Sequence, residues 1–332
     1  MKILVITSKF VKEPIEKLRK VLKEKKINYT IVDKFDPNIE HDVVFVIGED
    51  RDVLATVQEM KTNVKPILGI SITGATGFLT EVDIENIKAT IHKFDKGDYT
   101  IEKLRRIRVS CSKCTAYALN EVAIFPSKSA TLMEYALYVD DELIWRDFSD
   151  GIIVSTPLGS TAYSMSAGGP IISPKAKVFS IVSVNSMDPT RRPLIVSDNS
   201  IISIRDIVSK HAPEVIIDGI KRYKVLDAIK ITKSRSPALL IRFKKDKQEL
   251  HEKIKKKMEF ARELMNLPPS AKFILKILEY EGPQSQKNLI KKTMLPPRTV
   301  RHALKILIDK GIIREKIALT RDARQKIYSI IR

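Results

Sequence analysis

The sequence predicts a multidomain α/β plus β chain that ends in a small α+β domain. Strands and helices alternate over residues 1–100, which is typical of a parallel sheet built from βαβ units. Short β-type runs separated by turn residues fill residues 101–245, the last being Ala238–Phe243, and they predict a second, β-rich domain. A charged, helix-forming linker over 246–268 leads to helices and a hairpin over 269–332, the pattern of a winged helix.

The N-terminal region indicates one candidate site by its topology. We expect strands at Lys2–Thr7, Tyr29–Val32, Asp42–Ile47 and Ile67–Ile70, and helices at Glu13–Lys25 and 53–60. In parallel sheets, ligands bind beyond the carboxyl ends of the strands. The segment that follows Ile47 is therefore expected to carry a site.

The chain is strongly basic, and the excess is uneven. Its 332 residues carry a formal charge of +19, of which +11 falls on residues 249–332, where 20 Lys and Arg outnumber 9 Asp and Glu. A basic excess concentrated in one small domain indicates nucleic acid as a partner. The alternative is a generally lysine-rich, thermophilic composition with solvated charged faces. The charge alone does not separate the two.

No feature of the sequence indicates a membrane or an export signal. The longest apolar runs, such as Ile152–Val154 and Val43–Ile47, are far too short to span a bilayer. The N-terminal residues lack a small-residue cleavage site and are interpreted as a first strand, so we expect a cytoplasmic protein. The two cysteines, Cys111 and Cys114, are too few for a structural zinc site, and no metal site is predicted. They are interpreted as small residues beside a strand, with a redox dithiol or a metal-ligand pair as alternatives.

The segment Asp150–Pro170, DGIIVSTPLGSTAYSMSAGGP, has the composition of a nucleotide-binding turn. An apolar strand runs into a cluster of Gly, Ser and Thr, where backbone N–H groups can approach a polar ligand closely. Asp150 and the pair Asn120-Glu121 lie at similar strand edges, and an ionised carboxylate is suited to accept hydrogen bonds from ribose hydroxyls. The alternative is a hydroxyl-rich hairpin turn without a ligand.

This stretch resembles the most diagnostic motif of the NAD kinases, DG-x-(I/V)-STP-x-GSTAY-S-x-SAGGP. Asn120-Glu121 matches the NE pair of that family, and Pro66–Tyr99 resembles its PVLGIN-x-G-x-LGFLTEV segment. Downstream, Arg192-Pro193-Leu194 and Asp218-Gly219 match its RPL and DG elements. The resemblance covers residues 1–245. It implies an NAD kinase-like fold, in which an α/β domain on the ATP side precedes a β-rich NAD-binding domain.

The resemblance also implies roles for individual residues. Members of the family phosphorylate the 2′-hydroxyl of the adenosine ribose of NAD, with ATP as donor and usually Mg²⁺. By this pattern Asn120 and Glu121 hold the adenine-side ribose and base, and Asp150 binds a ribose hydroxyl or the nicotinamide side. The cofactor-binding set also includes Phe78, Ser160, Thr161, Ala162, Tyr163, Ser166 and Asp218. For the two aromatic residues, plain core packing is the alternative.

The family's GGDGT phosphate loop reads Gly48-Glu49-Asp50-Arg51-Asp52 here, and Asp50 matches its catalytic base. Glycines in such loops let backbone N–H groups approach phosphate oxygens without a side chain in the way. Glu49 and Asp52 add negative charge instead, and two unit charges about 4 Å apart repel by about 4 kcal/mol at an effective dielectric constant of about 20. We therefore expect NAD(H) or NADP(H) binding to be retained, and ATP- and Mg²⁺-dependent kinase activity to be weak or lost. The alternative is a tolerated variant in an active NAD kinase.

The C-terminal region predicts helices at Ser270–Tyr280, Ser285–Thr293 and Arg298–Lys310, followed by a wing at Ile312–Ile317 and Tyr328–Ile331. The stretch 295–313 resembles the PxRTVRxALxxLxxxGLI pattern of archaeal MarR-like winged helices. The residues expected to face the major groove or phosphates of double-stranded DNA are Arg298, Thr299, Arg301, His302 and Lys305. Protein docking is the alternative use of such a domain.

These features together predict a dinucleotide-responsive transcriptional regulator, in which the linker helix couples ligand binding to DNA binding. The first alternative is an active NAD kinase, forming NADP⁺ from NAD⁺ and ATP, with an appended regulatory domain. A weaker alternative is a nucleotide-binding scaffold that docks proteins. Related kinases form dimers and tetramers, and winged-helix regulators usually act as dimers, so a homo-oligomer is expected.

Overall fold

The computed structural model describes residues 1–7, 12–72, 77–111, 114–128, 131–225, 227–243, 266–281, 283–320 and 323–330. Contacts divide the chain into two compact units. The first comprises residues 1–70, 79–82 and 86–244, and it contains both the α/β and the β-rich parts. The second comprises residues 71–78, 83–85 and 245–332, and it contains the C-terminal helices.

A mainly parallel sheet forms the α/β part. Within the described residues its strands run in the order β2-β1-β3-β4-β19-β6, with β5 paired to β4. The pairs β1–β2, β1–β3 and β3–β4 are parallel, which confirms the predicted βαβ pattern. The elements are β1 (Lys2–Thr7), α1 (Lys12–Glu24), β2 (Asn28–Val32), β3 (Val43–Ile47), α2 (Asp50–Glu59), β4 (Ile67–Ser71), β5 (Thr80–Asp83), a 3₁₀ turn (Ile84–Asn86), α3 (Ile87–Asp95), β6 (Thr100–Leu104) and β19 (Ala238–Arg242).

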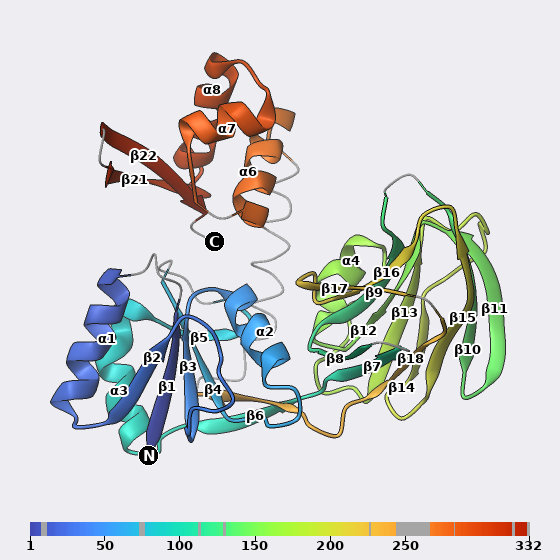
Figure 1. Ribbon diagram of the computed structural model, residues 1–332, viewed down its shortest axis with the longest axis horizontal. Helices are drawn as coiled ribbons and strands as arrows, with labels where there is room; N and C mark the ends of the chain where they lie inside the picture. Colours follow the sequence, from blue (N-terminus) through green and yellow to red (C-terminus); the bar gives the residue numbers. More distant parts are fainter. Residues whose placement is uncertain are drawn as a thin grey trace. The chain divides into compact units, whose positions relative to one another are not determined.

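Helices α2 and α3 cover opposite faces of this sheet (Figure 1). Successive side chains of a strand point to opposite faces. Val44 and Val46 of β3 share a core with Val53 and Val57 of α2. Phe45, which lies between them, contacts Phe94 of α3 at a ring-centroid distance of 5.2 Å. The continuous apolar run of β3 is therefore explained by burial on both faces.

Strand β19 lies in the α/β sheet, although the sequence groups its residues with the β-rich domain. It pairs in parallel with β4 through Leu240 and Ile67, and antiparallel with β6. The physical reason is that an apolar run specifies burial but not the partner strand. The module therefore returns to its first sheet before the chain continues to the winged helix.

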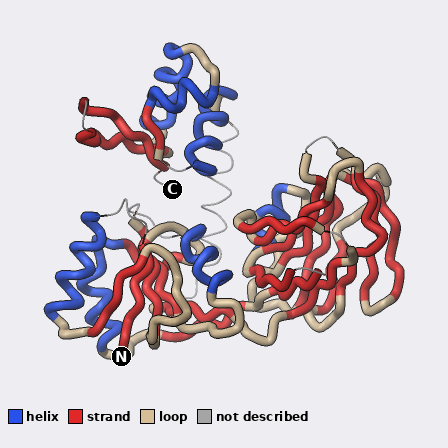
Figure 2. The backbone as a smooth tube through the Cα atoms, viewed as in Figure 1, coloured by secondary structure: helices blue, strands red, loops and turns tan. Residues whose placement is uncertain are grey.

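The β-rich part is a sandwich of two sheets, built almost entirely of strands (Figure 2). Within the described residues the sheets run β11-β10-β15-β18-β7-β8 and β14-β13-β12-β9-β16-β17. Their inner faces share one core, which includes Tyr135 and Ile204 of one sheet and Ile152 and Phe179 of the other. The elements are β7 (Ile107–Cys111), β8 (Cys114–Ala118), β9 (Glu121–Pro126), β10 (Met133–Val139), β11 (Glu142–Ser149), β12 (Gly151–Ser155), a 3₁₀ turn (Gly159–Thr161), α4 (Tyr163–Ser166), β13 (Val178–Val184), β14 (Leu194–Ser197), β15 (Ile202–Ser209), β16 (Pro213–Ile217), β17 (Lys221–Lys224) and β18 (Ile229–Lys233).

The C-terminal part contains three helices and a small sheet, in the residues that the structure describes there. These elements are α6 (Pro269–Glu281), β20 (Gln284–Ser285), α7 (Gln286–Thr293), α8 (Pro297–Asp309), β21 (Ile313–Thr320) and β22 (Ala323–Ile330). The Ser285 hydroxyl caps α7 by accepting from the Asn288 N–H at 3.3 Å, and Met294 ends that helix in the left-handed conformation. The winged-helix prediction is confirmed, and β20 adds a strand that sequence reasoning missed, because a two-residue strand carries no periodicity.

Three expectations concern single segments. Most of the linker predicted over 246–268 lies outside the described residues, which resume at Asn266. Among the described helices, none has the length and apolar character needed to cross a membrane. Cys111 is disulfide-bonded and stands opposite Cys114 in the register of β7 and β8. The two cysteines therefore lie in strands, in line with the interpretation of small residues in or beside a strand, and the redox dithiol stays an alternative.

Candidate functional site

The carboxylate of Asp218 joins the two parts of the first unit. Oδ1 accepts the backbone N–H groups of Asn120 at 2.7 Å and Glu121 at 3.1 Å. Oδ2 accepts the backbone N–H of Leu119 and the side-chain amide of Gln58, both at 3.0 Å. We call this arrangement of Asp218 with its four donors the Asp218 node. Burial raises the pKa of Asp218, and the four donated hydrogen bonds oppose that shift.

The Asp218 node joins three segments that lie far apart in the sequence: helix α2, the NE pair and the DG element. Asp218 returns a bond from its own N–H to the carbonyl of Glu121 at 3.0 Å, so the DG and NE elements form one unit. Gln58 lies near the end of α2, a helix about 15 Å long, whose other end begins at the phosphate loop. Glu59 adds an ion pair to Lys221 at 2.6 Å. One rigid helix therefore connects the phosphate loop to the predicted dinucleotide turns.

The STP-x-GST turn packs directly on the NE pair. The backbone N–H of Thr156 donates to the Asn120 carbonyl at 2.8 Å, and its hydroxyl donates to the Leu119 carbonyl at 2.7 Å. A Cβ atom on Gly159 would lie 2.1 Å from the Asn120 carbonyl oxygen. Glycine is therefore required at this position by the close approach of two backbones.

Gly159→Ala should lower the free energy of unfolding by about 3 kcal/mol, because the overlap is with backbone that cannot move aside. Gly97→Ala is the matched control: its φ is +71° and nothing lies near its Cβ position, so only backbone strain of about 1 kcal/mol is expected. Urea unfolding followed by the fluorescence of Trp145, the single tryptophan, measures both. Equal losses in the two variants would show that the predicted overlap is relieved.

The predicted cofactor residues differ in what their side chains can still contact. Tyr163 is 44% exposed and stacks on Phe125 with ring centroids 5.8 Å apart. Asp150 is partly exposed and accepts a hydrogen bond from Asn185 Nδ2 at 2.8 Å. Ser166 is exposed, and Phe78 is partly buried. These side chains, together with those of the partly exposed Asn120 and Ala162, have surface that a ligand can reach.

Other predicted cofactor residues are bound within the fold. The Ser160 hydroxyl is completely buried, donates to the Pro157 carbonyl at 2.7 Å and accepts from the Ile172 N–H at 3.0 Å. Thr161 is buried, and its hydroxyl lies 3.4 Å from the Leu158 carbonyl. Glu121 and Asp218 are also buried. The Ser160 and Thr161 hydroxyls and the Asp218 carboxylate therefore hold the backbone of these turns in place.

The phosphate loop closes on itself as the first turn of α2. Glu49 is the N-cap residue, and its side chain accepts the Asp52 backbone N–H. Asp52 Oδ2 in turn accepts the Glu49 backbone N–H at 2.8 Å, which completes a capping box. Gly48 faces this carboxylate, since a Cβ atom there would lie 2.2 Å from Asp52 Oδ2. Asp52 is exposed as a whole residue, but desolvation of its carboxyl group within this turn raises its pKa, against lowering contributions from the Glu49 N–H and Arg51.

Asp50 is oriented by a different segment. Its Oδ1 accepts the backbone N–H groups of Leu79 at 2.9 Å and Thr80 at 3.0 Å, and the Thr80 hydroxyl lies 3.4 Å away. The residue that matches the catalytic base is thus held by the start of β5. Asp50 is predictable from the sequence but its partners are not, because they are backbone groups 29 and 30 residues away.

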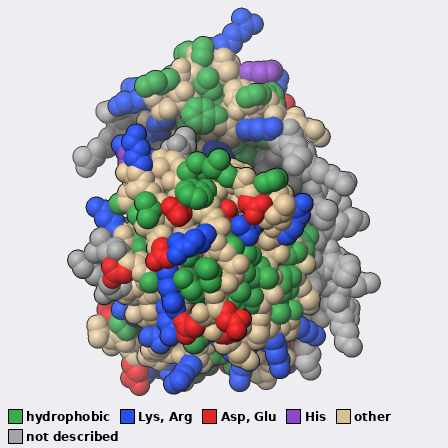
Figure 3. All heavy atoms as spheres, turned by 90° about the vertical axis from the view of Figure 1, so that its right-hand side faces the viewer, with side chains coloured by type: hydrophobic (Ala, Val, Ile, Leu, Met, Phe, Trp, Pro, Cys, Tyr) green, Lys and Arg blue, Asp and Glu red, His purple; other side chains and the backbone are tan. Residues whose placement is uncertain are grey.

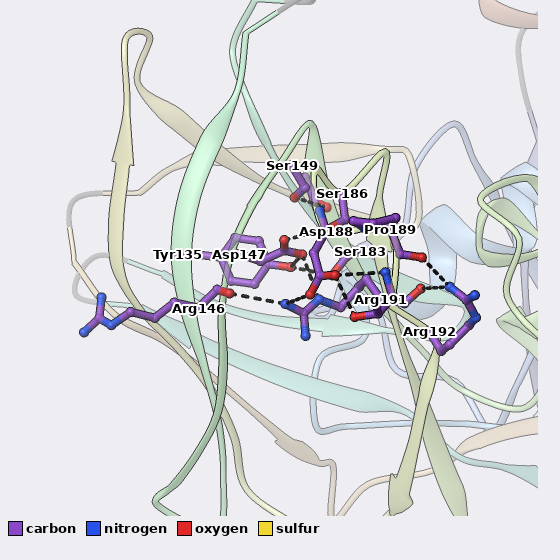
Figure 4. A network of polar contacts seen from close by, with 12 residues as sticks. Tyr135, Arg146, Asp147, Ser149, Ser183, Ser186, Asp188, Pro189, Arg191 and Arg192 are labelled. Atoms are coloured by element: carbon purple, nitrogen blue, oxygen red, sulfur yellow. Dashed lines mark hydrogen bonds and ion pairs between the residues drawn. The ribbon is translucent and has the colours of Figure 1, made fainter.

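A polar cavity that was not predicted from the sequence lies beside the SAGG turn, which contributes Ala167 and Gly168 to its lining. Figure 4 shows the network of polar contacts that includes Ser183, Ser186 and Asp188 of the same lining. The cavity has a volume of about 320 Å³ and is lined by Ala167, Gly168, Val182, Ser183, Ser186, Asp188, Pro189, Arg191, Arg192 and Pro193. Behind it, buried Asp147 accepts hydrogen bonds from Ser186 at 2.6 Å and Tyr135 at 3.1 Å. Arg191 forms ion pairs with Asp147 at 3.5 Å and Asp188 at 3.0 Å. Burial raises the pKa of Tyr135 to about 12, so this phenol stays a hydrogen-bond donor.

One signal could have indicated this cavity. Trp145, Asp147 and Ser149 alternate along β11 on the side that faces the core, and two of the three are polar. Polar side chains at inward positions need internal partners. The partners come from β10 and from the segment before the RPL element, so the tertiary structure alone shows that they converge.

In the second unit, α8 presents a basic face. Val300, Ala303, Leu304 and Leu307 are buried in the helical core. The remaining face carries Arg298, Arg301, His302 and Lys305, all exposed, whereas Thr299 is partly buried. Helix α8 begins at Pro297, one residue before the predicted start at Arg298, because proline is well suited to the first helical position. By contrast, acidic and basic side chains are interspersed on the face of the molecule shown in Figure 3, over the β-rich part.

The families that the chain matches correspond to these parts. Residues 5–99 match the ATP-NAD kinase N-terminal domain, and residues 119–243 match the ATP-NAD kinase C-terminal domain. The chain belongs to the NAD kinase family. Residues 273–314 match a family of winged helix-turn-helix DNA-binding domains. In this member of the NAD kinase family, such a domain therefore follows the kinase module.

Relatives support the same assignment. An NAD kinase of Methanothermobacter thermautotrophicus is 35% identical over 223 residues, which cover 67% of this chain and 77% of that protein. The structure of an NAD kinase from Archaeoglobus fulgidus in complex with ATP superimposes with a TM-score of 0.67 and 29% identity, covering 78% of this chain and 99% of that chain. Yeast NADH kinase complexed with NADH shares the fold, with a TM-score of 0.65, 20% identity, and 76% and 85% of the two chains covered.

Proposed function

We propose that this NAD kinase family member is a dinucleotide-responsive DNA-binding regulator whose kinase activity is weak or lost. The observation that carries the proposal is the capping box of the phosphate loop. Carboxylates of Glu49 and Asp52 accept the N–H groups at the start of α2, where the family pattern has glycine and threonine. A triphosphate needs such N–H donors and is repelled by such carboxylates. The described loop residues therefore do not fit the phosphate chain of ATP.

The dinucleotide side of the module is built differently. The NE, STP-x-GST and DG turns keep the family residues and are joined through the Asp218 node. Asn120, Asp150, Ala162, Tyr163 and Ser166 offer side-chain surface beside these turns. We infer that these residues hold NAD(H) or NADP(H), and that the cavity beside the SAGG turn takes a polar end of the dinucleotide. The yeast relative with NADH supports this class of ligand.

We further propose double-stranded DNA as the partner of the winged helix. The exposed face of α8 carries three cationic side chains and His302. Arg and Lys on a recognition helix bind phosphates and guanine edges. Because winged-helix regulators usually bind DNA as dimers, a homodimer or homotetramer is part of this proposal.

A specific observation favours the alternative of an active kinase. Asp50, the match to the catalytic base, is held in place by the N–H groups of Leu79 and Thr80. A base alone accelerates phosphoryl transfer little, because catalysis rests mainly on positioning and on charge stabilisation around the phosphates. We therefore place this alternative second.

The proposal is tested by two measurements on the full-length chain. NADP⁺ formation from NAD⁺, ATP and Mg²⁺ should be close to background, whereas NAD(H) or NADP(H) should bind in a titration and change the affinity for DNA. The DNA is a duplex selected by the protein itself from a random pool. Kinase turnover at ordinary rates of about 1–100 s⁻¹ would overturn the regulator and establish the alternative.

Arg301→Ala should weaken binding of the selected duplex by about tenfold or more, because one cationic contact to a base edge or phosphate is lost. Lys276→Ala, which removes a charge from exposed surface of α6, is the matched control for net charge. Fluorescence anisotropy at fixed salt compares the two variants. Equal, small losses would indicate that α8 is not the DNA-contacting helix.

A further inference from the structure

The chain leaves the kinase module at the same edge of the sheet that carries the phosphate loop. Strands β3, β4 and β19 are mutually parallel through the pairs β3–β4 and β4–β19, so their carboxyl ends lie on one edge. Loop 48–52 follows β3. Beyond β19 the chain continues through residues 244–265 to the winged helix. The phosphate loop and the point where the chain leaves β19 therefore lie at the same edge of this sheet.

A buried acidic residue holds this exit. Glu81 of β5 is 4% exposed. Its Oε1 accepts the backbone N–H of Phe243 at 3.0 Å, and its Oε2 accepts Arg242 Nη1 at 2.9 Å. We call Glu81, Arg242 and Phe243 the exit clamp. Arg242 Nε also binds Glu102 at 2.8 Å, but that carboxylate is 42% exposed and belongs to β6.

The two residues just before Glu81 contact the phosphate loop. Leu79 and Thr80 donate their N–H groups to the Asp50 carboxylate. Peptide geometry is nearly inextensible, so residues 79–81 shift together along the strand. A displacement of Asp50 at the start of α2 would thus pass to Arg242 and Phe243, the last two described residues before the linker, through the hydrogen bonds of the Asp50 and Glu81 carboxylates and the peptide chain between residues 79 and 81.

Burial makes this connection stiff. Removing one partner from a buried ion pair leaves an uncompensated charge, so Glu81 and Arg242 separate only at high cost. Packed interiors respond to such constraints by moving between discrete arrangements and not by gradual stretching. The exit of the chain therefore keeps the position that residues 79–81 dictate.

We propose that the exit clamp transmits dinucleotide occupancy to the winged helix, by fixing the start of the linker in a position set by Asp50 and β5. This inference rests on the proposed function, because it concerns how the regulator responds to NAD(H) or NADP(H). This requires that the dinucleotide bind with different affinities to two positions of Arg242 and Phe243. By linkage, DNA binding then changes the affinity for the dinucleotide by the same factor.

Glu81→Gln in the full-length chain tests the proposal. The neutral amide keeps one acceptor for the Phe243 N–H but loses the attraction for Arg242. Among NAD⁺, NADH, NADP⁺ and NADPH, the tightest binder of the wild type is the probe. Its Kd and the Kd for DNA alone should each stay within about twofold of wild type, whereas the ratio of DNA Kd values with and without the probe should fall to about one. Allosteric ratios are usually about 5–150-fold.

Glu102→Gln is the matched control, because it removes the other carboxylate from the same arginine outside the connection to Asp50. It should keep the wild-type ratio. A wild-type ratio of one overturns the proposed function itself. A wild-type ratio above one that persists in Glu81→Gln overturns the exit clamp alone.

Hydrogen exchange of the Phe243 amide gives a second readout that needs no variant. This N–H donates to Glu81, so the probe should change its protection by about fivefold or more in the wild type. Unchanged protection at saturating probe would overturn the proposal even if Glu81→Gln failed to fold.

Discussion

Replacing Glu49, Arg51 and Asp52 with glycine, glycine and threonine should raise NADP⁺ formation from NAD⁺ and ATP by about 10²–10³-fold. The changes remove two carboxylates from the start of α2 and return N–H donors to the phosphates. A repulsion of about 4 kcal/mol corresponds to about a thousandfold in rate, and loss of one well-placed donor in other enzymes costs about 10²–10³. Single-turnover and steady-state assays of NADP⁺ formation, with Mg²⁺ present, measure the gain.

Asp50→Asn in the restored chain is the control for this experiment. It keeps an acceptor for the N–H groups of Leu79 and Thr80 but removes the basic oxygen. The regained activity should disappear. If the unaltered chain already turns over as fast as the restored chain, the capping box does not impair ATP binding, and the protein is an active kinase. The loss of the capping box itself should lower stability by only about 1 kcal/mol.

Asp218→Ala should have the largest effect on stability, about 4 kcal/mol or more. Four N–H donors lose their acceptor at once, in a place that water does not reach. An unsatisfied buried donor costs about 1–3 kcal/mol. The fluorescence of Trp145, which lies in the β-rich part, follows the unfolding of that part in urea. Dinucleotide binding should be lost as well, because the NE turn is no longer fixed.

Asp206→Ala is a close control for that variant. Both aspartates adopt the left-handed backbone, with φ of +48° at Asp218 and +53° at Asp206, so alanine is strained equally at the two positions. Asp206, however, is exposed and pairs only on the surface with Arg146. Its replacement should shift the urea midpoint far less. Similar shifts in the two variants would show that backbone strain, and not the node, explains the loss.

Much of this architecture followed from local patterns. The alternation of strands and helices predicted the parallel sheet, because two parallel strands need a crossover connection, which is usually a helix. The charge of residues 249–332 and the spacing of Val300, Ala303, Leu304 and Leu307 predicted the winged helix with its basic face. The family resemblance identified the NE, STP-x-GST and DG turns.

The substitutions in the phosphate loop were also visible in the sequence, but their meaning was not. The presence of Glu49 and Asp52 in the loop predicted added negative charge. Only the structure showed that these carboxylates fold back onto the first turn of α2, where each accepts the backbone N–H group of the other residue. The orientation of a side chain depends on the helix start, which the GGDGT comparison alone does not give.

By itself the sequence determined the elements, the family and the residues that line the turns, because these depend on local periodicity and on motifs that are continuous in the chain. The tertiary structure decided which of those residues act together. Asp218 meets Gln58 across 160 positions, and Glu81 meets Arg242 across 161. Such contacts depend on how the sheet returns through β19 to its first strands, and no local pattern encodes that return, because strand pairing is fixed by long-range packing.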